Sequence, residues 1–91
     1  MSITRDEAIK RASADAASRT GVSADKVKQI AVEDAEFPDA SLGAATKGEM
    51  SGMMLTPGWR VTLEADGKKL EYRASSNQLR LYGFKGKNYL L

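Results

Sequence analysis

The stretch that decides the fold is residues 59–74, WRVTLEADGKKLEYRA. Its apolar side chains occupy every second position on either side of a central Asp66-Gly67 pair, in the order Trp59, Val61, Leu63, Leu70, Tyr72 and Ala74. This period of two is typical of a strand with one buried face. Asp-Gly is a preferred dipeptide of two-residue hairpin turns. The stretch therefore predicts a β-hairpin, and we expect Trp59 to be buried and to anchor whatever packs on the sheet.

Further strands are predicted on both sides of this hairpin. Leu79 and Leu81 alternate with polar residues and indicate a last strand, followed by a basic and apolar tail at residues 85–91. Residues 27–37 form an initial strand that Pro38 ends, since proline cannot donate to a strand ladder. Residues 38–49 are rich in small residues and indicate an irregular loop, in which Asp39 caps the backbone as an Asx turn.

Two segments just before the hairpin have their own signals. Residues 50–55 are a candidate second strand. Pro57-Gly58 fits the central positions of a type II turn, which requires a positive φ at Gly58.

A helix precedes the strands. Thr4 and Glu7 have the spacing of a capping box, and Gly21 is placed to end the helix in the left-handed conformation. Residues 5–20 between them carry a stripe of mostly alanine, so the helix should pack closely. We expect an α+β fold: an N-terminal helix on a four-stranded antiparallel sheet, in one domain of residues 1–84 with the tail outside it.

The segment Phe37-Pro38-Asp39-Ala40-Ser41-Leu42-Gly43, with Pro57-Gly58 and Tyr72 downstream, resembles a bacterial small-domain family of cystatin-like or PepSY-like character. The resemblance covers about residues 20–83. Its signature is of the type Trp-Pro-Asp-x-Ser-Leu-Gly-Cys-Pro, and this chain lacks the cysteines. The family's cysteine positions correspond here to Ala44 and a site near Gly83. The resemblance implies that those two positions are spatial neighbours, and it carries no activity with it.

Composition excludes several function classes. The 91 residues include no His and no Cys, so a usual general base, a disulfide and a thiolate metal site are all absent. Gly43 and Gly48 have P-loop spacing, but the P-loop lysine is missing. The only carboxylate cluster consists of Glu33, Asp34, Glu36 and Asp39. Alternate residues of a strand face opposite sides, so the cluster is better explained as a solvated strand edge than as a metal site. We expect no enzyme, no cofactor and no bound metal.

Charge and aromatic residues permit a weak nucleic-acid hypothesis. Residues 44–91 hold eight basic and four acidic side chains, a net charge of +4 against −2 for residues 1–43. Stacking on bases requires exposed aromatic rings beside the cations. Strand alternation leaves Tyr82 and Phe84 as the expected exposed pair. A core with a solvated basic face is the favoured interpretation, and nucleic-acid binding through this half is the alternative.

Methionines indicate a different kind of surface. Met50, Met53 and Met54 are spread over both faces of the candidate strand, so some of them should be exposed and available to a protein partner or to self-association. Together with Tyr82 and Phe84 they are the predicted binding residues. The chain begins with charged residues and has no long apolar run, so we expect a cytoplasmic, non-membrane, non-catalytic interaction or regulatory module.

Overall fold

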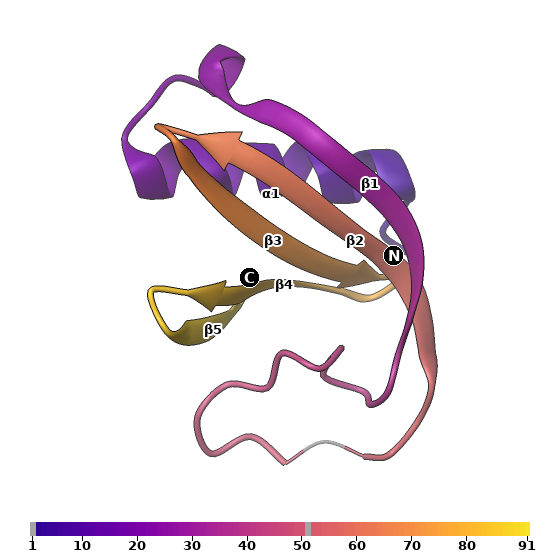
Figure 1. Ribbon diagram of the computed structural model, residues 1–91. Coiled ribbons are helices and arrows are strands. Elements are labelled where there is room, and N and C mark those ends of the chain that lie inside the picture. Colours follow the sequence, from indigo (N-terminus) through magenta and orange to yellow (C-terminus); the bar gives the residue numbers. More distant parts are fainter. Residues whose placement is uncertain (1, 51) are drawn as a thin grey trace.

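In the described part of the chain, one α-helix lies across one face of a five-stranded antiparallel sheet whose strand order follows the chain (Figure 1). The computed structural model describes residues 2–50 and 52–91 of this chain. The elements are α1 (Arg5–Thr20), the short 3₁₀ helix η1 (Ala24–Lys26), β1 (Lys28–Phe37), β2 (Thr56–Ala65), β3 (Lys68–Ser75), β4 (Gln78–Phe84) and β5 (Lys87–Leu90). The predicted α+β class is confirmed, with five strands in place of four. No helix formed by the described residues is long and apolar enough to cross a bilayer.

Both ends of α1 are set by the residues that the sequence indicated. The Glu7 backbone N–H donates to Thr4 Oγ1 at 3.1 Å, which satisfies one of the free donors of the first turn. Gly21 has a φ of 75° and returns its N–H to the carbonyl oxygen of Ala17 at 2.9 Å. The predicted bounds of the helix, residues 5–20, are confirmed.

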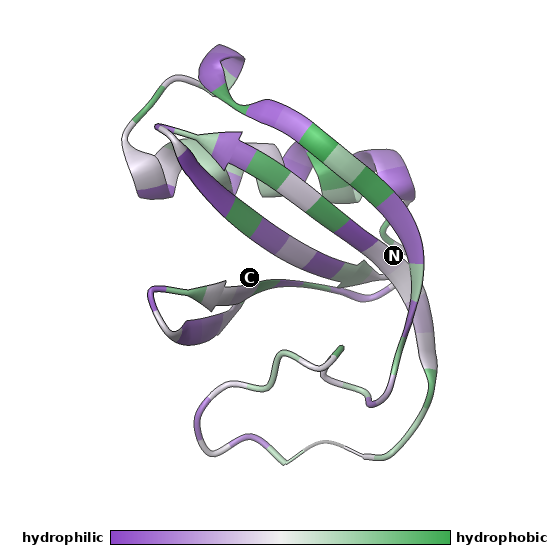
Figure 2. Cartoon of the chain, viewed as in Figure 1, coloured by the Kyte–Doolittle hydropathy of each residue, from purple (hydrophilic) through white to green (hydrophobic). Residues whose placement is uncertain are grey.

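The main core lies between α1 and the sheet. Figure 2 shows the alternation of hydrophobic and hydrophilic residues along β2 and β3 that produces it. The buried residues include Ala8, Ala12, Ala16, Val61, Leu63, Leu70, Tyr72, Ala74, Leu79 and Leu81. The alanines let the helix backbone approach β2 and β3 closely, as expected from the stripe. The hydroxyl of Tyr72 crosses this layer and donates to Asp15 Oδ2 at 2.7 Å, an oxygen that also accepts from Arg19 Nε at 2.7 Å.

The predicted hairpin is confirmed. Asp66 and Gly67 have φ values of 54° and 71°, and Ala65 pairs with Lys68, so the turn is of the type that matches the twist of β-strands. Trp59 lies on the predicted face and packs against the core, but it is only half-buried because it stands near the end of β2. The prediction of a fully buried tryptophan is therefore wrong.

The segment predicted as a C-terminal tail contains strand β5. Lys85 and Gly86 have φ values of 52° and 78°, so they form a second tight turn. Lys-Gly is not one of the dipeptides that predict such a turn from sequence. A β-bulge also interrupts β4, because Tyr82 and Gly83 together oppose the single residue Asn88. The bulge reverses the alternation, so Phe84 packs against the helix-side core.

Two other predictions before the hairpin are wrong. Residues 50 and 52–55 form no strand, and residue 51 lies outside the described residues. Gly58 does not occupy a turn and has no positive φ; it lies within β2. Glycine is needed there for another reason, since a Cβ on Gly58 would overlap the carbonyl oxygen of Ala74 on the neighbouring strand.

Candidate interaction site on the 38–55 loop

Residues 38–55 join β1 to β2 and pass below the sheet in Figure 1. The first part of this loop packs on the sheet face that α1 leaves open. Arg73 and Arg80 extend from that face, since their neighbours Tyr72 and Leu81 lie on the helix side. Leu42 and Ala44 of the loop are fully buried against it.

The first turn of the loop is built around Asp39. Its Oδ1 accepts from the Ser41 N–H at 3.0 Å, the Ser41 hydroxyl at 2.8 Å and the Gly43 N–H at 2.9 Å. These bonds favour the ionised carboxylate, and the Gly43 N–H, followed by the Ser41 hydroxyl, does most to lower the pKa of Asp39. The predicted Asx turn is confirmed, and it carries Leu42 and Gly43 through φ values of 60° and 67°.

The last turn of the loop is fastened by an ion pair. Arg80 donates from Nη1 to Glu49 Oε1 at 2.6 Å and from Nη2 to Glu49 Oε2 at 2.7 Å, a bidentate geometry. Arg80 is only 4% exposed. Its hydrogen bonds, with a further one from the Thr46 N–H, lower the pKa of Glu49 to about 2. The pair therefore holds residue 49 against β4 at neutral pH.

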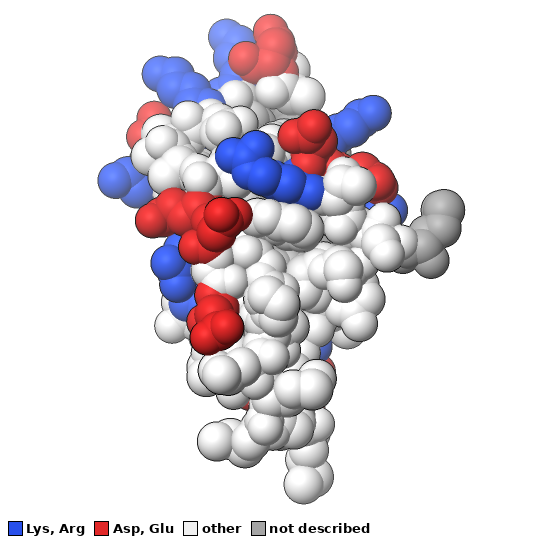
Figure 3. All heavy atoms as spheres, turned by 90° about the vertical axis from the view of Figure 1, so that its right-hand side faces the viewer, with Lys and Arg blue, Asp and Glu red and all other residues white. Residues whose placement is uncertain are grey.

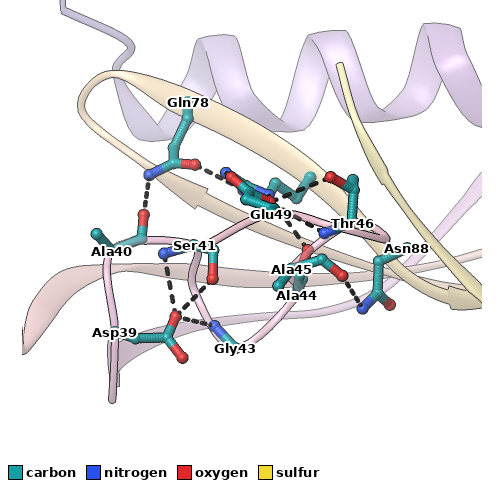
Figure 4. Close-up of polar contacts among 11 residues, drawn as sticks. Asp39, Ala40, Ser41, Gly43, Ala44, Ala45, Thr46, Glu49, Gln78 and Asn88 are labelled. Atoms are coloured by element: carbon teal, nitrogen blue, oxygen red, sulfur yellow. Dashed lines mark hydrogen bonds and ion pairs between the residues drawn. The ribbon is translucent and has the colours of Figure 1, made fainter. Parts of the chain in front are cut away.

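Between these turns, three side chains of the sheet donate to carbonyl oxygens of the loop. Gln78 Nε2 donates to Ala40 at 2.6 Å, Arg73 Nη1 to Leu42 at 3.0 Å and Asn88 Nδ2 to Ala45 at 2.9 Å. The bonds from Gln78 and Asn88 are visible in Figure 4. Buried backbone groups of an irregular loop need such partners. The loop up to Glu49 is thus fixed from several strands at once.

Asn88 also connects the loop to the bulge in β4. Its Oδ1 accepts from the Gly83 N–H at 2.8 Å while its Nδ2 donates to Ala45. One side chain therefore joins positions 83 and 45. The resemblance predicts closeness of positions 44 and 83, and a disulfide between Ala44→Cys and Gly83→Cys stays a prediction.

The structure does not bring the predicted pair Tyr82 and Phe84 together, because the bulge sends them to opposite faces. Tyr82 is 40% exposed on the loop side, where the Arg73 guanidinium lies 3.8 Å from its ring centroid. Phe84 is half-buried on the helix side, with Tyr89 edge-on at 6.4 Å between ring centroids. A shared stacking surface is therefore excluded for these two rings.

Beyond Glu49 the loop exposes four large apolar side chains, which we call the apolar tip: Met50 (97% exposed), Met53 (94%), Met54 (61%) and Leu55 (66%). No charged residue occurs in residues 50–59. Figure 3 shows the result, since the lower end of the molecule is almost free of charge while both signs crowd the upper part. Exposure of several large apolar side chains within one short segment is a feature from which a binding surface can be proposed.

The arginines of the C-terminal half are committed to internal contacts. Arg60 pairs with Glu71 at 3.5 Å, Arg73 stacks on Tyr82, and Arg80 is buried with Glu49. Arg73 and Arg80 are therefore largely withdrawn from the surface, and the charge of the more exposed Arg60 is offset by Glu71, which reduces the positive charge that a nucleic acid would need. Among the described residues, no three His, Cys, Asp or Glu side chains gather in a way that could hold a metal ion.

Sequence reasoning missed Arg80, Glu49, Gln78 and Asn88, since bonds between distant polar side chains leave no periodic signal.

One family model matches the chain. It is described as a domain of unknown function, DUF8738, and it covers residues 9–82, from within α1 to β4. No curated protein and no solved structure matches the chain.

Proposed function

This chain belongs to the DUF8738 family, and we propose that it is a non-catalytic protein-interaction module that binds a partner protein through its apolar tip. The observation that carries the proposal is the contrast between the two parts of the loop that meet at Glu49. Up to this residue the loop is pinned to the sheet, and directly after it Met50 and Met53 are almost fully exposed. A rigid base under an exposed apolar segment lowers the entropy cost of binding.

The partner is a different protein that offers an apolar groove. Methionine side chains are flexible and polarisable, and they adapt to grooves of varied shape. The tip forms the narrow end of the molecule in Figure 3, whereas a two-fold dimer needs a self-complementary patch. Three hollows on the described surface of this chain each include a charged residue, namely Asp34, Lys10 or Lys87, and suit the tip poorly.

The test compares the wild type with Met50→Gln/Met53→Gln/Met54→Gln. These residues are exposed, so the triple variant should keep its circular dichroism and melting temperature. A protein captured from the source cell and purified should bind the wild type, and the triple variant should bind it at least tenfold more weakly. The matched control is Leu91→Gln, at another exposed apolar position, which should leave the affinity unchanged.

Two outcomes would contradict the proposal. Equal affinity of the triple variant for the purified partner would remove the apolar tip from the interface. A wild type that sediments as a dimer, with the triple variant monomeric, would show that the tip binds a second copy of the chain. Sedimentation at several concentrations therefore accompanies the binding measurement.

The proposal includes a cytoplasmic location and keeps the cystatin-like or PepSY-like resemblance as its structural analogy. A fold held by an ion pair and hydrogen bonds, with no cysteine in the sequence, is compatible with a reducing compartment. One helix on an antiparallel sheet is compatible with the analogy. Fractionation of the source cell tests the location. The nucleic-acid alternative is not advanced, because Arg60, Arg73 and Arg80 are engaged within the fold.

A further inference from the structure

Strand β1 is an edge strand with one unpaired side. It is ten residues long and pairs with β2 alone, and no other described residue pairs with its outer edge. The helix packs mainly on β2 and β3, and on β1 only Val32 is packed against the helix-side core among the described residues. An unpaired strand edge presents a row of N–H and C=O groups to which an extended peptide can add as a further strand.

A hollow of about 390 Å³ opens over β1 and β2, and extends from Asp34 and Ala35 on β1 across β2 to Ser76. Asp34 and Trp59 stand opposite each other in the β1–β2 register, and both line it. The half-buried position of Trp59 leaves part of its indole available. A carboxylate next to an indole suits a cationic side chain, which can pair with the one and lie on the face of the other.

The charge of β1 complements a basic segment. Glu33, Asp34 and Glu36 are exposed, and no ion pair within 4.0 Å among the described residues involves any of them. Arg60, which stands opposite Glu33 in the register, pairs with Glu71. A second copy of β1 would bring only one lysine, Lys28, against three carboxylates. A segment with several basic residues is the better complement.

We infer that β1 binds an extended basic segment of a protein partner as an added strand, with one lysine or arginine of that segment seated against Asp34 and Trp59. This surface differs from the apolar tip, so the inference does not depend on the partner proposed above. Backbone pairing supplies affinity, and the hollow selects a cation at one position and thereby sets the register.

The experiment uses the full chain and a synthetic ten-residue peptide of alternating lysine and valine. Trp59 is the only tryptophan, so its emission reports directly on the hollow. The lysine peptide should change that emission saturably and protect β1 amides from hydrogen exchange. A peptide with glutamate in place of lysine should do neither. Absence of saturable binding of the lysine peptide at low ionic strength would overturn the inference.

Two further comparisons separate strand addition from simple charge attraction. Asp34→Asn/Glu36→Gln should weaken binding of the lysine peptide about fivefold, while Asp25→Asn, an exposed change in η1, should leave it unchanged. Lysine peptides N-methylated at odd or at even positions form a second pair. Only one of the two patterns blocks the backbone groups that face β1, so one peptide should lose binding and the other keep it. Equal binding of both would overturn strand addition.

The apolar-tip variant Met50→Gln/Met53→Gln/Met54→Gln should bind the lysine peptide as the wild type does. Loss of binding in that variant would move the peptide site to the tip and overturn the assignment to β1. Concentration-dependent growth of the wild-type chain into large assemblies, suppressed by Asp34→Asn/Glu36→Gln, would show that another copy of the chain occupies the edge and would equally overturn it.

Discussion

The two faces of the sheet are covered by different means. On one face, α1 packs through alanines onto apolar residues such as Leu63 and Tyr72. On the other, residues 38–49 are held by side chains of the sheet that donate to the loop backbone and by the pair of Arg80 with Glu49. Apolar burial is non-directional and contributes to the whole fold, whereas each polar contact fixes one point of the chain. The helix-covered face should therefore determine global stability and the loop-covered face local order.

The largest expected effect comes from the helix-covered face. Leu63 is fully buried in the core, and Leu63→Ala should lower the free energy of unfolding by about 3 kcal/mol through lost burial and the cavity left behind. Urea denaturation measures the change, and hydrogen exchange should accelerate on both faces together. A decrease in unfolding free energy of less than about 1 kcal/mol would contradict the assignment of global stability to the helix-covered face.

The second effect concerns Arg80. Arg80→Met removes the bonds to Glu49 and to the Ala44 carbonyl but keeps an apolar stem, and should cost about 2 kcal/mol. Hydrogen exchange should accelerate in residues 39–49 and stay slow in α1. Arg80→Lys keeps the positive charge but not the bidentate guanidinium. It is the matched control and should lose less stability. Equal acceleration in α1 would show that the two faces act as one unit.

A third prediction places a polar contact on the helix side. Thr4→Ala removes the acceptor of the Glu7 N–H and should cost about 1 kcal/mol, with fraying limited to the first turn of α1. Thr4→Ser keeps the acceptor and should be close to neutral. If loss of the Thr4 contact also affects only nearby residues, the comparison becomes sharper. Polar contacts would then act locally on either face of the sheet, and only apolar burial would determine global stability.

The smallest expected effect is produced by acid. The pKa of Glu49 is lowered from 4.5 to about 2 by Arg80 and Thr46, so its ionised form stabilises the fold above pH 4.5. That contribution is lost as the pH falls from about 4.5 to about 2, although a neutral carboxyl still accepts hydrogen bonds. Amide shifts of residues 44–49 should titrate in this window in the wild type. In Glu49→Gln the same shifts should stay constant, and a titration that persists there would assign the change to another group.

The sequence predicted the parts of the fold that depend on local or periodic signals. Thr4, Glu7 and Gly21 defined the helix, and the alternation around Asp66-Gly67 defined the central hairpin. Strand β5 was missed because Lys85-Gly86 carries only one glycine and an unremarkable lysine at a positive φ.

The candidate site was predicted less completely. Exposure of Met50, Met53 and Met54 was expected in part, yet the assignment of residues 50–55 to a strand was wrong. No strand pairs with the described residues of this segment, and the Gly52 carbonyl oxygen accepts from the Ala40 N–H within the same loop. The contacts that fasten the loop join residues 31 to 43 positions apart. Pattern reasoning looks at neighbours a few positions away, so these contacts could not be read from it.

The strand order has a consequence for synthesis on the ribosome. The β2–β3 turn closes over two residues, but β1 reaches β2 across residues 38–55, which costs roughly 2 kcal/mol more in closure entropy. Translation also delivers β1 long before its only partner strand. During that interval β1 has no partner strand, and Glu33, Asp34 and Glu36 should disfavour its pairing with apolar or acidic segments of other emerging chains while leaving it open to a basic one.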